Sequence, residues 1–483
     1  MRHHTRRILF YSFATIFIIA TPIVVLYSTG LVLDFQARRL NKTGGFFVKT
    51  NETGIRVSAN GIQKTETSFF GRGAMVNNLD PGTVAVEVAK DGFATWKKSI
   101  EIEEQLIQEF SSILLIPQKI EFATIATTTR QGSDTAPKAL LPSPNGNILL
   151  DVTKEKGLTQ LWLIAPASAT RPLNIALPTG QEFASAEWNL AGDAVFMEIL
   201  SGKNKQWNIL HSDGRNEIII NYKSRLPIEE ATSTASQPKF INGASIAQIS
   251  QATDNEDFFY ILDRTDKNVY RWQQSKNSAA KILSDIHSFR TFSDKIVFVT
   301  SSGFIGLADP AGEKIEILNR PGLFLDDTPC RIFQDENGEI AIIDSAGGLY
   351  PENLDTRSFR VLGGNFTNIL FSPDDDKLGF IRKEMLGLIL TKDERRQPFG
   401  NAFENRRLID AGVPIHNFIW FNKKSTHLIF TTKDGVFITE ADARFGPNTI
   451  TLTTGQYLIA ANPNNPNNFY LSNGPTVQSF TLE

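Results

Sequence analysis

The hydrophobic pattern of the first 33 residues differs from that of the remaining chain. Residues 8–33 contain no charged side chain and read ILFYSFATIFIIATPIVVLYSTGLVL. As a helix, at about 1.5 Å per residue, this segment reaches roughly 39 Å and exceeds the ~30 Å hydrocarbon core of a bilayer. Pro22 removes one helix hydrogen bond and can bend such a helix. The pattern therefore predicts a transmembrane helix over 8–33.

Basic residues stand on both sides of this apolar segment: Arg2, Arg6, Arg7, Arg38, Arg39 and Lys42. Those before the segment favour an N-terminus in the cytoplasm, with residues 1–7 as a short cytoplasmic tail. A cleaved signal peptide is the alternative, but the apolar stretch is long for one and no A-x-A site follows it. We expect an uncleaved, single-pass signal anchor with most of the chain outside the cytoplasmic membrane.

Residues 43–117 follow a period-two pattern that predicts short β-strands. Between Thr83 and Val88 the apolar and polar positions alternate, which places Val84, Val86 and Val88 on one face. Asn60-Gly61 is the two-residue signal of a tight hairpin. Further short strands are expected at 45–49, 55–57, 99–102 and 110–116. This pattern predicts a small all-β unit, with Phe93 and Trp96 over the open end of its sheet.

The residues from 78 to 96 also carry a family resemblance. They read N-L-x-P-G-x-x-x-V-x-V-x-K-x-G-F-x-x-W, which resembles a PEGA domain, a small extracytoplasmic β-module of bacteria and archaea. The matching residues are Leu79, Pro81, Gly82, Val86, Val88, Lys90, Gly92, Phe93 and Trp96. The Pro-Glu-Gly-Ala tetrapeptide of the family is replaced by Asn51-Glu52-Thr53-Gly54. The resemblance implies a β-sandwich that acts as a membrane-proximal stalk or adaptor.

A repeated pattern occupies the long C-terminal region. Residues 118–140 are polar and read as a linker, although 120–127 can form a strand. After it, a turn rich in Pro, Asn, Asp and Gly followed by an apolar strand recurs at 37- to 53-residue intervals, beginning at Ser143, Trp188, Phe240, Ser293, Asp335, Ser372, Phe421 and Pro463. Such a repeat is typical of a β-propeller. We predict seven or eight blades over 141–483, with eight favoured, and the strand at 120–127 can complete the last blade.

The repeat style resembles TolB-like and WD-repeat propellers, without their Gly-His and Trp-Asp pairs. Membrane-anchored PEGA proteins of uncultured bacterial lineages also carry a propeller-like region after this module. The fold class expected for the whole chain is therefore mainly β: a transmembrane helix, a PEGA-type sandwich and a propeller.

Charge and cysteine content limit the classes of partner. The net charge is −3, and residues 1–42 carry +5, so the remainder carries −8. A mildly acidic body does not provide the basic surface that nucleic acid requires. The single Cys330 cannot form an internal disulfide and is expected to be a small buried apolar residue.

No catalytic, cofactor-binding or metal-binding residue is predicted. The sequence lacks H-E-x-x-H and G-x-S-x-G. His3 and His4 belong to the expected tail, and His211, His287, His416 and His427 are expected in turns or at the surface. Asp374-Asp375-Asp376 lacks the spacing of a calcium loop and is expected to form a solvated turn.

The expected function is that of a non-enzymatic envelope protein in which the PEGA stalk presents the propeller to a protein or cell-wall partner. Two alternatives stay open. One is an enzyme or small-ligand sensor that uses the propeller channel, and the other is a structural spacer without a ligand. The sequence alone does not identify a binding residue.

Overall fold

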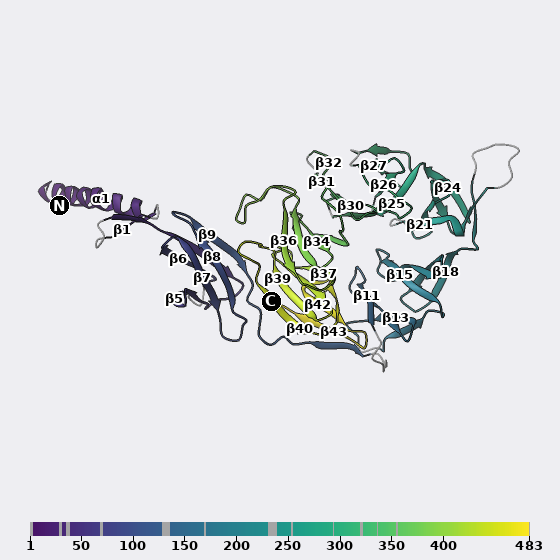
Figure 1. Cartoon of the computed structure of the whole chain (residues 1–483), viewed down its shortest axis with the longest axis horizontal. Helices are drawn as coiled ribbons and strands as arrows, with labels where there is room; N and C mark the ends of the chain where they lie inside the picture. Colours follow the sequence, from purple (N-terminus) through teal and green to yellow (C-terminus); the bar gives the residue numbers. More distant parts are fainter. Residues whose placement is uncertain are drawn as a thin grey trace.

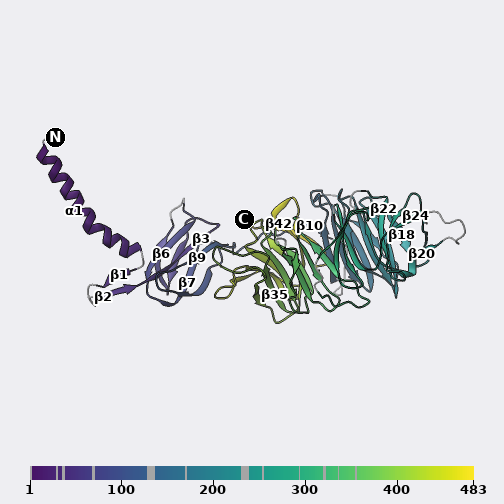
Figure 2. The same ribbon diagram turned by 90° about the horizontal axis from the view of Figure 1, so that it is seen from above.

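The computed structural model describes residues 3–28, 31–34, 39–67, 71–127, 136–168, 171–229, 239–252, 255–292, 294–318, 322–335, 337–353 and 356–482. This part of the chain is mainly β-strand. Figures 1 and 2 show three parts in a row: the helix α1, a small pair of sheets and a larger group of sheets around an open centre.

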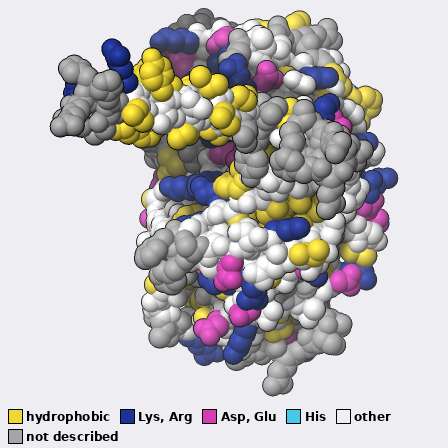
Figure 3. Space-filling model, turned by 90° about the vertical axis from the view of Figure 1, so that its left-hand side faces the viewer, with side chains coloured by type: hydrophobic (Ala, Val, Ile, Leu, Met, Phe, Trp, Pro, Cys, Tyr) yellow, Lys and Arg dark blue, Asp and Glu magenta, His cyan; other side chains and the backbone are white. Residues whose placement is uncertain are grey.

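The N-terminal helix α1 (His3–Ser28) ends before the predicted boundary. Residues 31–34 belong instead to β1 (Leu31–Asp34), which pairs with β2 (Arg39–Lys42), so the expected helix over 8–33 is wrong at its C-terminal end. Hydrophobic side chains of α1 such as Phe10, Phe13 and Phe17 are exposed. Figure 3 shows yellow hydrophobic side chains along the projecting helix. None of the described helices combines the length and apolarity needed to cross a membrane.

Two sheets form a unit that we call the N-terminal sandwich (residues 44–113). One sheet has the order β6-β3-β9 and the other β5-β4-β7-β8. The strands are β3 (Gly44–Thr50), β4 (Arg56–Ala59), β5 (Ile62–Glu66), β6 (Gly73–Leu79), β7 (Gly82–Ala89), β8 (Trp96–Ile102) and β9 (Ile107–Ile113). β9 runs parallel to β3 and is an edge strand.

The core of the N-terminal sandwich follows the predicted alternation. Val84, Val86 and Val88 are buried between the two sheets, whereas the residues between them face outward. The hairpin at Asn60-Gly61 is confirmed, and both residues have the positive φ (50° and 76°) that this tight turn requires. Trp96 is 1% exposed and lies in the core, and the partly buried Phe93 packs against the same cluster.

Eight four-stranded antiparallel sheets follow, and we call them together the ring. The first four are β11 (Ala136–Pro142), β12 (Leu149–Glu155), β13 (Leu158–Ile164), β14 (Leu173–Ala176); β15 (Gln181–Trp188), β16 (Ala194–Ser201), β17 (Asn204–His211), β18 (Asn216–Asn221); β21 (Ile246–Gln251), β22 (Phe258–Asp263), β23 (Val269–Gln273), β24 (Ser278–Leu283); and β25 (Ile286–Phe292), β26 (Lys295–Thr300), β27 (Ile305–Ala308), β28 (Ile315–Ile317). A hairpin of β19 (Arg225–Pro227) and β20 (Phe240–Asn242) and the short η1 (Gly243–Ser245) join the second and third sheets.

The other four sheets complete the ring. They are β29 (Arg331–Gln334), β30 (Ile340–Ile343), β31 (Leu349–Asn353), β32 (Ser358–Phe359); β33 (Asn368–Phe371), β34 (Lys377–Arg382), β35 (Met385–Leu390), β36 (Asn405–Asp410); β37 (Ile415–Phe421), β38 (His427–Thr432), β39 (Gly435–Glu440), β40 (Thr449–Thr454); and β41 (Leu458–Asn462), β42 (Asn465–Ser472), β43 (Thr476–Thr481) with β10 (Ala123–Thr127). The eight sheets agree with the eight repeats counted in the sequence.

Strands from both ends of the ring share its last sheet. β10 pairs antiparallel with β43, so a strand that precedes the ring joins the three last strands of the chain. The first and last sheets also touch, because Ser472 donates a 2.9 Å hydrogen bond to Asp151 and their apolar side chains form one cluster. The strand expected within 120–127 is thus confirmed, and β10 and the start of β11 lie in the segment expected as a linker.

Apolar side chains fill the space between consecutive sheets. Leu150 and Val152 of the first sheet, for example, pack against Val195 and Met197 of the second. A single four-stranded sheet would expose such residues to water, so each sheet is stabilised by its neighbours. The first strands β11, β15, β21 and β25 lie towards the open centre (Figure 1).

Candidate functional site: the junction of the sandwich and the ring

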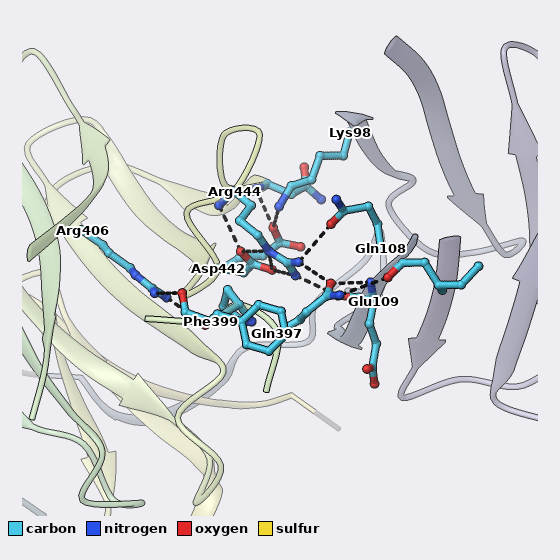
Figure 4. Close-up of polar contacts among 12 residues, drawn as sticks. Lys98, Gln108, Glu109, Gln397, Phe399, Arg406, Asp442 and Arg444 are labelled. Atoms are coloured by element: carbon cyan, nitrogen blue, oxygen red, sulfur yellow. Dashed lines mark hydrogen bonds and ion pairs between the residues drawn. The ribbon is translucent and has the colours of Figure 1, made fainter. Parts of the chain in front are cut away.

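A cleft of about 320 Å³ separates the N-terminal sandwich from the ring. Its sandwich side is formed by residues 109–113, and its ring side by β35, the loop 391–404 and residues 440–444. Leu388 and Leu390 form an apolar part of the lining, while Lys377, Arg406 and Arg444 contribute cations. Figure 4 shows the polar contacts between the sandwich and the ring. We call this region of contact the junction.

A buried ion pair lies at the centre of the junction. Lys98 Nζ of β8 lies 2.8 Å from Glu440 Oε2 of β39, and the two side chains are 1% and 7% exposed. The indole N–H of Trp96 donates to Oε1 of the same carboxylate, and the backbone N–H of Asn448 donates to Oε2 at 3.1 Å. Removing two charges from water is costly, and these extra hydrogen bonds are what make the burial of Glu440 tolerable.

The local sequence explains how Lys98 comes to be buried. In β8 the positions of Trp96, Lys98, Ile100 and Ile102 point to the same face and are all buried. Lys98 therefore sits at an inward position of an alternating strand. Its ammonium group also lies 5.5 Å from the centre of the Phe110 ring, where the face of the aromatic ring attracts a cation.

The free edge of β9 is held by one side chain of the ring. The carboxamide of Gln397 accepts a hydrogen bond from the Glu109 amide (2.8 Å) and donates one to the Ile107 carbonyl (3.0 Å). An unpaired edge strand presents such groups to any passing strand. Gln397 supplies the donor and the acceptor that a neighbouring strand would supply, and so links the loop 391–404 to the sandwich.

Arg444 connects the same edge to the loop after β39. Its guanidinium donates to the Glu109 carbonyl and to Gln397 Oε1, both at 2.8 Å, and is held by Asp442 at 2.6 Å. It also lies over the Phe110 ring at 4.9 Å. Arg444 thus contacts Glu109 of the sandwich and Gln397 and Asp442 of the ring at the same time. The five fixed N–H donors of an arginine suit this position better than the ammonium group of a lysine would.

A second arginine orders the loop that carries Gln397. Arg406 donates to the Phe399 carbonyl (2.6 Å) and the Pro398 carbonyl (3.4 Å), and pairs with Glu404 at 2.8 Å. The Arg406 side chain is mostly buried. Figure 4 shows Arg406 and Arg444 on opposite sides of this loop, so the loop is held between the ring and the sandwich.

His427 lies beside the buried ion pair. It is the cross-strand neighbour of Glu440 and is buried, so its expected position in a turn or at the surface is wrong. Burial lowers the pKa of His427 to about 4, although the nearby Glu440 carboxylate opposes this shift. The imidazole is therefore neutral at ordinary pH, and Nδ1 lies 3.0 Å from the Thr426 hydroxyl.

Of the other residues singled out in the sequence, the structure brings Cys330 and His287 together, with Cys330 Sγ 3.9 Å from His287 Nδ1. Cys330 is buried as expected, and burial raises the pKa of its thiol to about 12. Asp374 pairs with Lys377 in the β33–β34 turn and contributes to the lining of the cleft. His211 is close to Glu217, His287 contacts Ser288, and His416 is exposed on β37. Within the described ranges, no group of three or more His, Cys, Asp or Glu is arranged to hold a metal ion.

Sequence reasoning singled out Trp96 and Asp374 but placed neither at a junction, and it did not identify Lys98, Glu440, Gln397 or Arg444. Lys98 carried a signal, because a lysine on the apolar face of an alternating strand needs a buried carboxylate partner. Glu440, Gln397 and Arg444 carried none, since their roles depend on contacts with residues about 290 to 340 positions earlier in the chain. The arrangement they form is a rigid attachment made of paired charges and edge hydrogen bonds.

Comparisons with known proteins add little to this description. No family model matches the chain, and no curated protein matches it. Among solved structures, the crystal structure of the computationally designed Ika8 protein is similar with a TM-score of 0.45 and 11% sequence identity. That match covers 74% of this chain and 99% of the designed one.

Proposed function

We propose that this chain is a non-enzymatic cell-envelope protein in which a PEGA-like sandwich holds an eight-bladed β-propeller at a fixed orientation. The observation that carries the proposal is the junction. Lys98, Gln397 and Arg444 use their polar groups to attach the sandwich to the ring, not to leave them open for substrate. A flexible tether would need none of these buried contacts. In a scaffold that presents a binding surface, they keep the surface in one orientation.

The sheet topology supports the propeller part of this proposal. Eight four-stranded antiparallel sheets follow one another in sequence order around an open centre, and β10 completes the last of them. Propellers typically close in this way because each blade needs two neighbours to bury its faces. Under the proposal, the partner is a protein or the cell wall, and it binds a face of the propeller.

The N-terminal helix supports a location at the membrane. Exposed hydrophobic side chains cover much of α1, and a large exposed apolar surface marks a contact with lipid or another protein. We place the N-terminus in the cytoplasm, because of the basic residues before the helix, and the sandwich and propeller outside. Alkaline phosphatase fused after Glu483 is then expected to be active in cells, whereas a cytoplasmic C-terminus would leave it inactive.

Binding to the cell wall is tested by sedimentation. The full chain in detergent is mixed with purified sacculi and pelleted at low and high salt, with an unrelated detergent-solubilised membrane protein as the control. Retention at both salts supports a wall partner, and retention at low salt alone indicates non-specific charge attraction. If the chain stays in solution, crosslinking in intact membranes tests for a protein partner. Failure of both experiments would overturn the proposal and leave the two alternatives, a spacer without a ligand and an enzyme or small-ligand sensor that uses the propeller channel.

A further inference from the structure

The centre of the ring contains a cavity that is separate from the junction. Its volume is about 450 Å³. It is lined by the first strands of five consecutive sheets, β15, β21, β25, β29 and β33, and by residues of β16 and β17. β15, β21 and β25 border the open centre in Figure 1. The polar residues of the lining include Glu187, Gln248, Ser250, Arg290, Arg331 and Asn368.

Arg331 is the first unusual feature of this cavity. Its guanidinium donates to the carbonyls of Thr367 (2.6 Å) and Phe366 (3.2 Å). Across the described ranges of the chain, no carboxylate forms an ion pair with it, and burial lowers the pKa of this guanidinium. Two carbonyls fix the orientation of the group without neutralising it. The cavity wall therefore carries an oriented, uncompensated positive charge.

Arg290 places a second guanidinium close to the first. It lies on β25 and donates to the carbonyl of Ile332, the residue that follows Arg331, at 3.1 Å. Its contact with a carboxylate is loose, since Nη2 lies 3.5 Å from Glu187 Oε1, and both side chains are about half exposed, at 41% and 59%. Two guanidinium groups thus line the cavity together with two carboxylates: Glu187, which Arg290 holds loosely, and Glu198, which pairs with Lys205 at 2.9 Å.

Aromatic side chains line the cavity beside these polar groups. Phe196, Trp207, Phe289 and Phe333 belong to the same cavity. Pockets for small ligands commonly combine a mainly apolar wall with a few fixed polar groups that determine orientation. Planar guanidinium groups match the geometry of carboxylate and phosphate oxygens, because they offer two parallel N–H donors.

From this geometry we propose that the central cavity of the ring binds a small ligand with an oxyanion and an apolar group, using Arg331 and Arg290. Arg331 supplies the permanent donor, and the ligand oxyanion takes the place of Glu187 at Arg290. The aromatic side chains contact the apolar part of the ligand. This site is independent of the junction and of any cell-wall partner. A test of ligand binding here therefore neither supports nor contradicts the function proposed above.

Calorimetric titration of the full chain in detergent tests the site with defined probes. The probes are N-acetylphenylalanine, its uncharged amide and inorganic phosphate. The acid is expected to bind and the amide to bind ~10-fold more weakly or less, since hydrogen bonds to charged groups are the stronger ones. Competition by phosphate would assign the site to oxyanions in general, and its absence would assign it to carboxylates. Equal binding of acid and amide, or binding of neither, overturns the proposal.

Three substitutions assign the binding to named residues. Arg331→Gln is expected to weaken the binding of N-acetylphenylalanine ~10-fold. Glu187→Gln removes the competing carboxylate and is expected to strengthen binding, an opposite change that a folding defect cannot imitate. Arg215→Gln makes the same charge change at an exposed turn between β17 and β18 and is expected to leave binding unchanged. Unchanged affinity in both cavity variants, or an equal loss in all three, contradicts the assignment.

Discussion

The ammonium nitrogen of Lys98 lies 2.8 Å from the Oε2 atom of Glu440, although the two residues are 342 positions apart. One belongs to the N-terminal sandwich and the other to the ring, and both side chains are almost completely buried. The ion pair therefore joins two folded parts of the chain, and neither charge has access to water if its partner is removed.

We predict that Lys98→Met destabilises the protein strongly. The substitution leaves the Glu440 carboxylate buried without its counter-ion, which typically costs about 3–5 kcal/mol. Thermal unfolding followed by circular dichroism measures the effect. The double variant Lys98→Met/Glu440→Leu is expected to recover much of the loss because no isolated charge remains.

Lys97 provides a matched control on the same strand. It points outward and pairs with Glu87, and both side chains are well exposed. Exposed pairs contribute only about 0–1 kcal/mol, so Lys97→Met is expected to have little effect. Equal destabilisation by the two substitutions would show that the buried pair has no special role.

A second prediction concerns the edge of β9. Gln397→Ala removes both hydrogen bonds that the side chain makes to this strand. The amide of Glu109 is then expected to exchange with solvent markedly faster, since a typical hydrogen bond contributes roughly 1 kcal/mol. Hydrogen–deuterium exchange of residues 107–113 measures the change.

The same variant is expected to self-associate more readily, because an uncovered edge strand can pair with another chain. Arg395→Ala changes the same loop without touching β9 and serves as the control. Unaltered exchange at Glu109 in Gln397→Ala would mean that Gln397 does not protect the edge.

The third prediction is a loss of stability in acid that depends on His427. Burial lowers the pKa of this imidazole from 6.5 to about 4 in the folded chain. The unfolded chain therefore takes up a proton first, and the contribution of His427 to stability is lost as the pH falls from 6.5 towards 4. Glu440 and Lys98 are the charged groups that face it.

Comparison of variants isolates this contribution. His427→Gln is expected to lose less stability than the unmodified chain over the same pH range, as measured by the thermal midpoint. His416→Gln, on an exposed position of β37, is expected to follow the unmodified chain. Parallel curves for all three proteins would exclude His427 as the titrating group.

The fourth prediction concerns Glu339, which is buried in the turn before β30. Burial, and next the neighbouring Asp335, raise the pKa of Glu339 to about 8. Because the folded chain holds this proton more tightly than the unfolded chain, the contribution is complete below pH 4.5 and declines as the pH rises towards 8. Lys392 opposes the shift, whereas Glu352 and Asp375 add to it.

Glu339→Gln replaces the titrating carboxyl with a neutral group of the same shape. The variant is expected to be more stable than the unmodified chain at pH 8 and to differ little from it at pH 4.5. Glu313→Gln, at an exposed turn, is the control for a surface carboxyl. A variant that is less stable at pH 8 would contradict the prediction.

The sequence predicts the local features of this fold better than it predicts contacts between residues that are far apart in the chain. Alternation identified the inward face of β7, and repeated turns identified eight sheets, because both signals lie within a few residues of one another. The strand predicted within 120–127 is β10, whose partner β43 is about 350 residues away, whereas the start of β11 was missed inside the expected linker over 118–140. His427 was misplaced for a similar reason, since it lies beside Phe421 and Glu440, which its own sequence neighbourhood does not reveal. The central cavity also arises only when first strands of five sheets meet.

The pairing of β10 with β43 has a mechanical consequence. A force that pulls the N-terminal part away from the ring runs along residues 118–122 into β10, and would strip that strand from the sheet that closes the ring. The contacts of Lys98, Gln397 and Arg444 act in parallel with this path and take the tension first. The junction thus offers a second path for a load that would otherwise fall on the sheet that closes the ring.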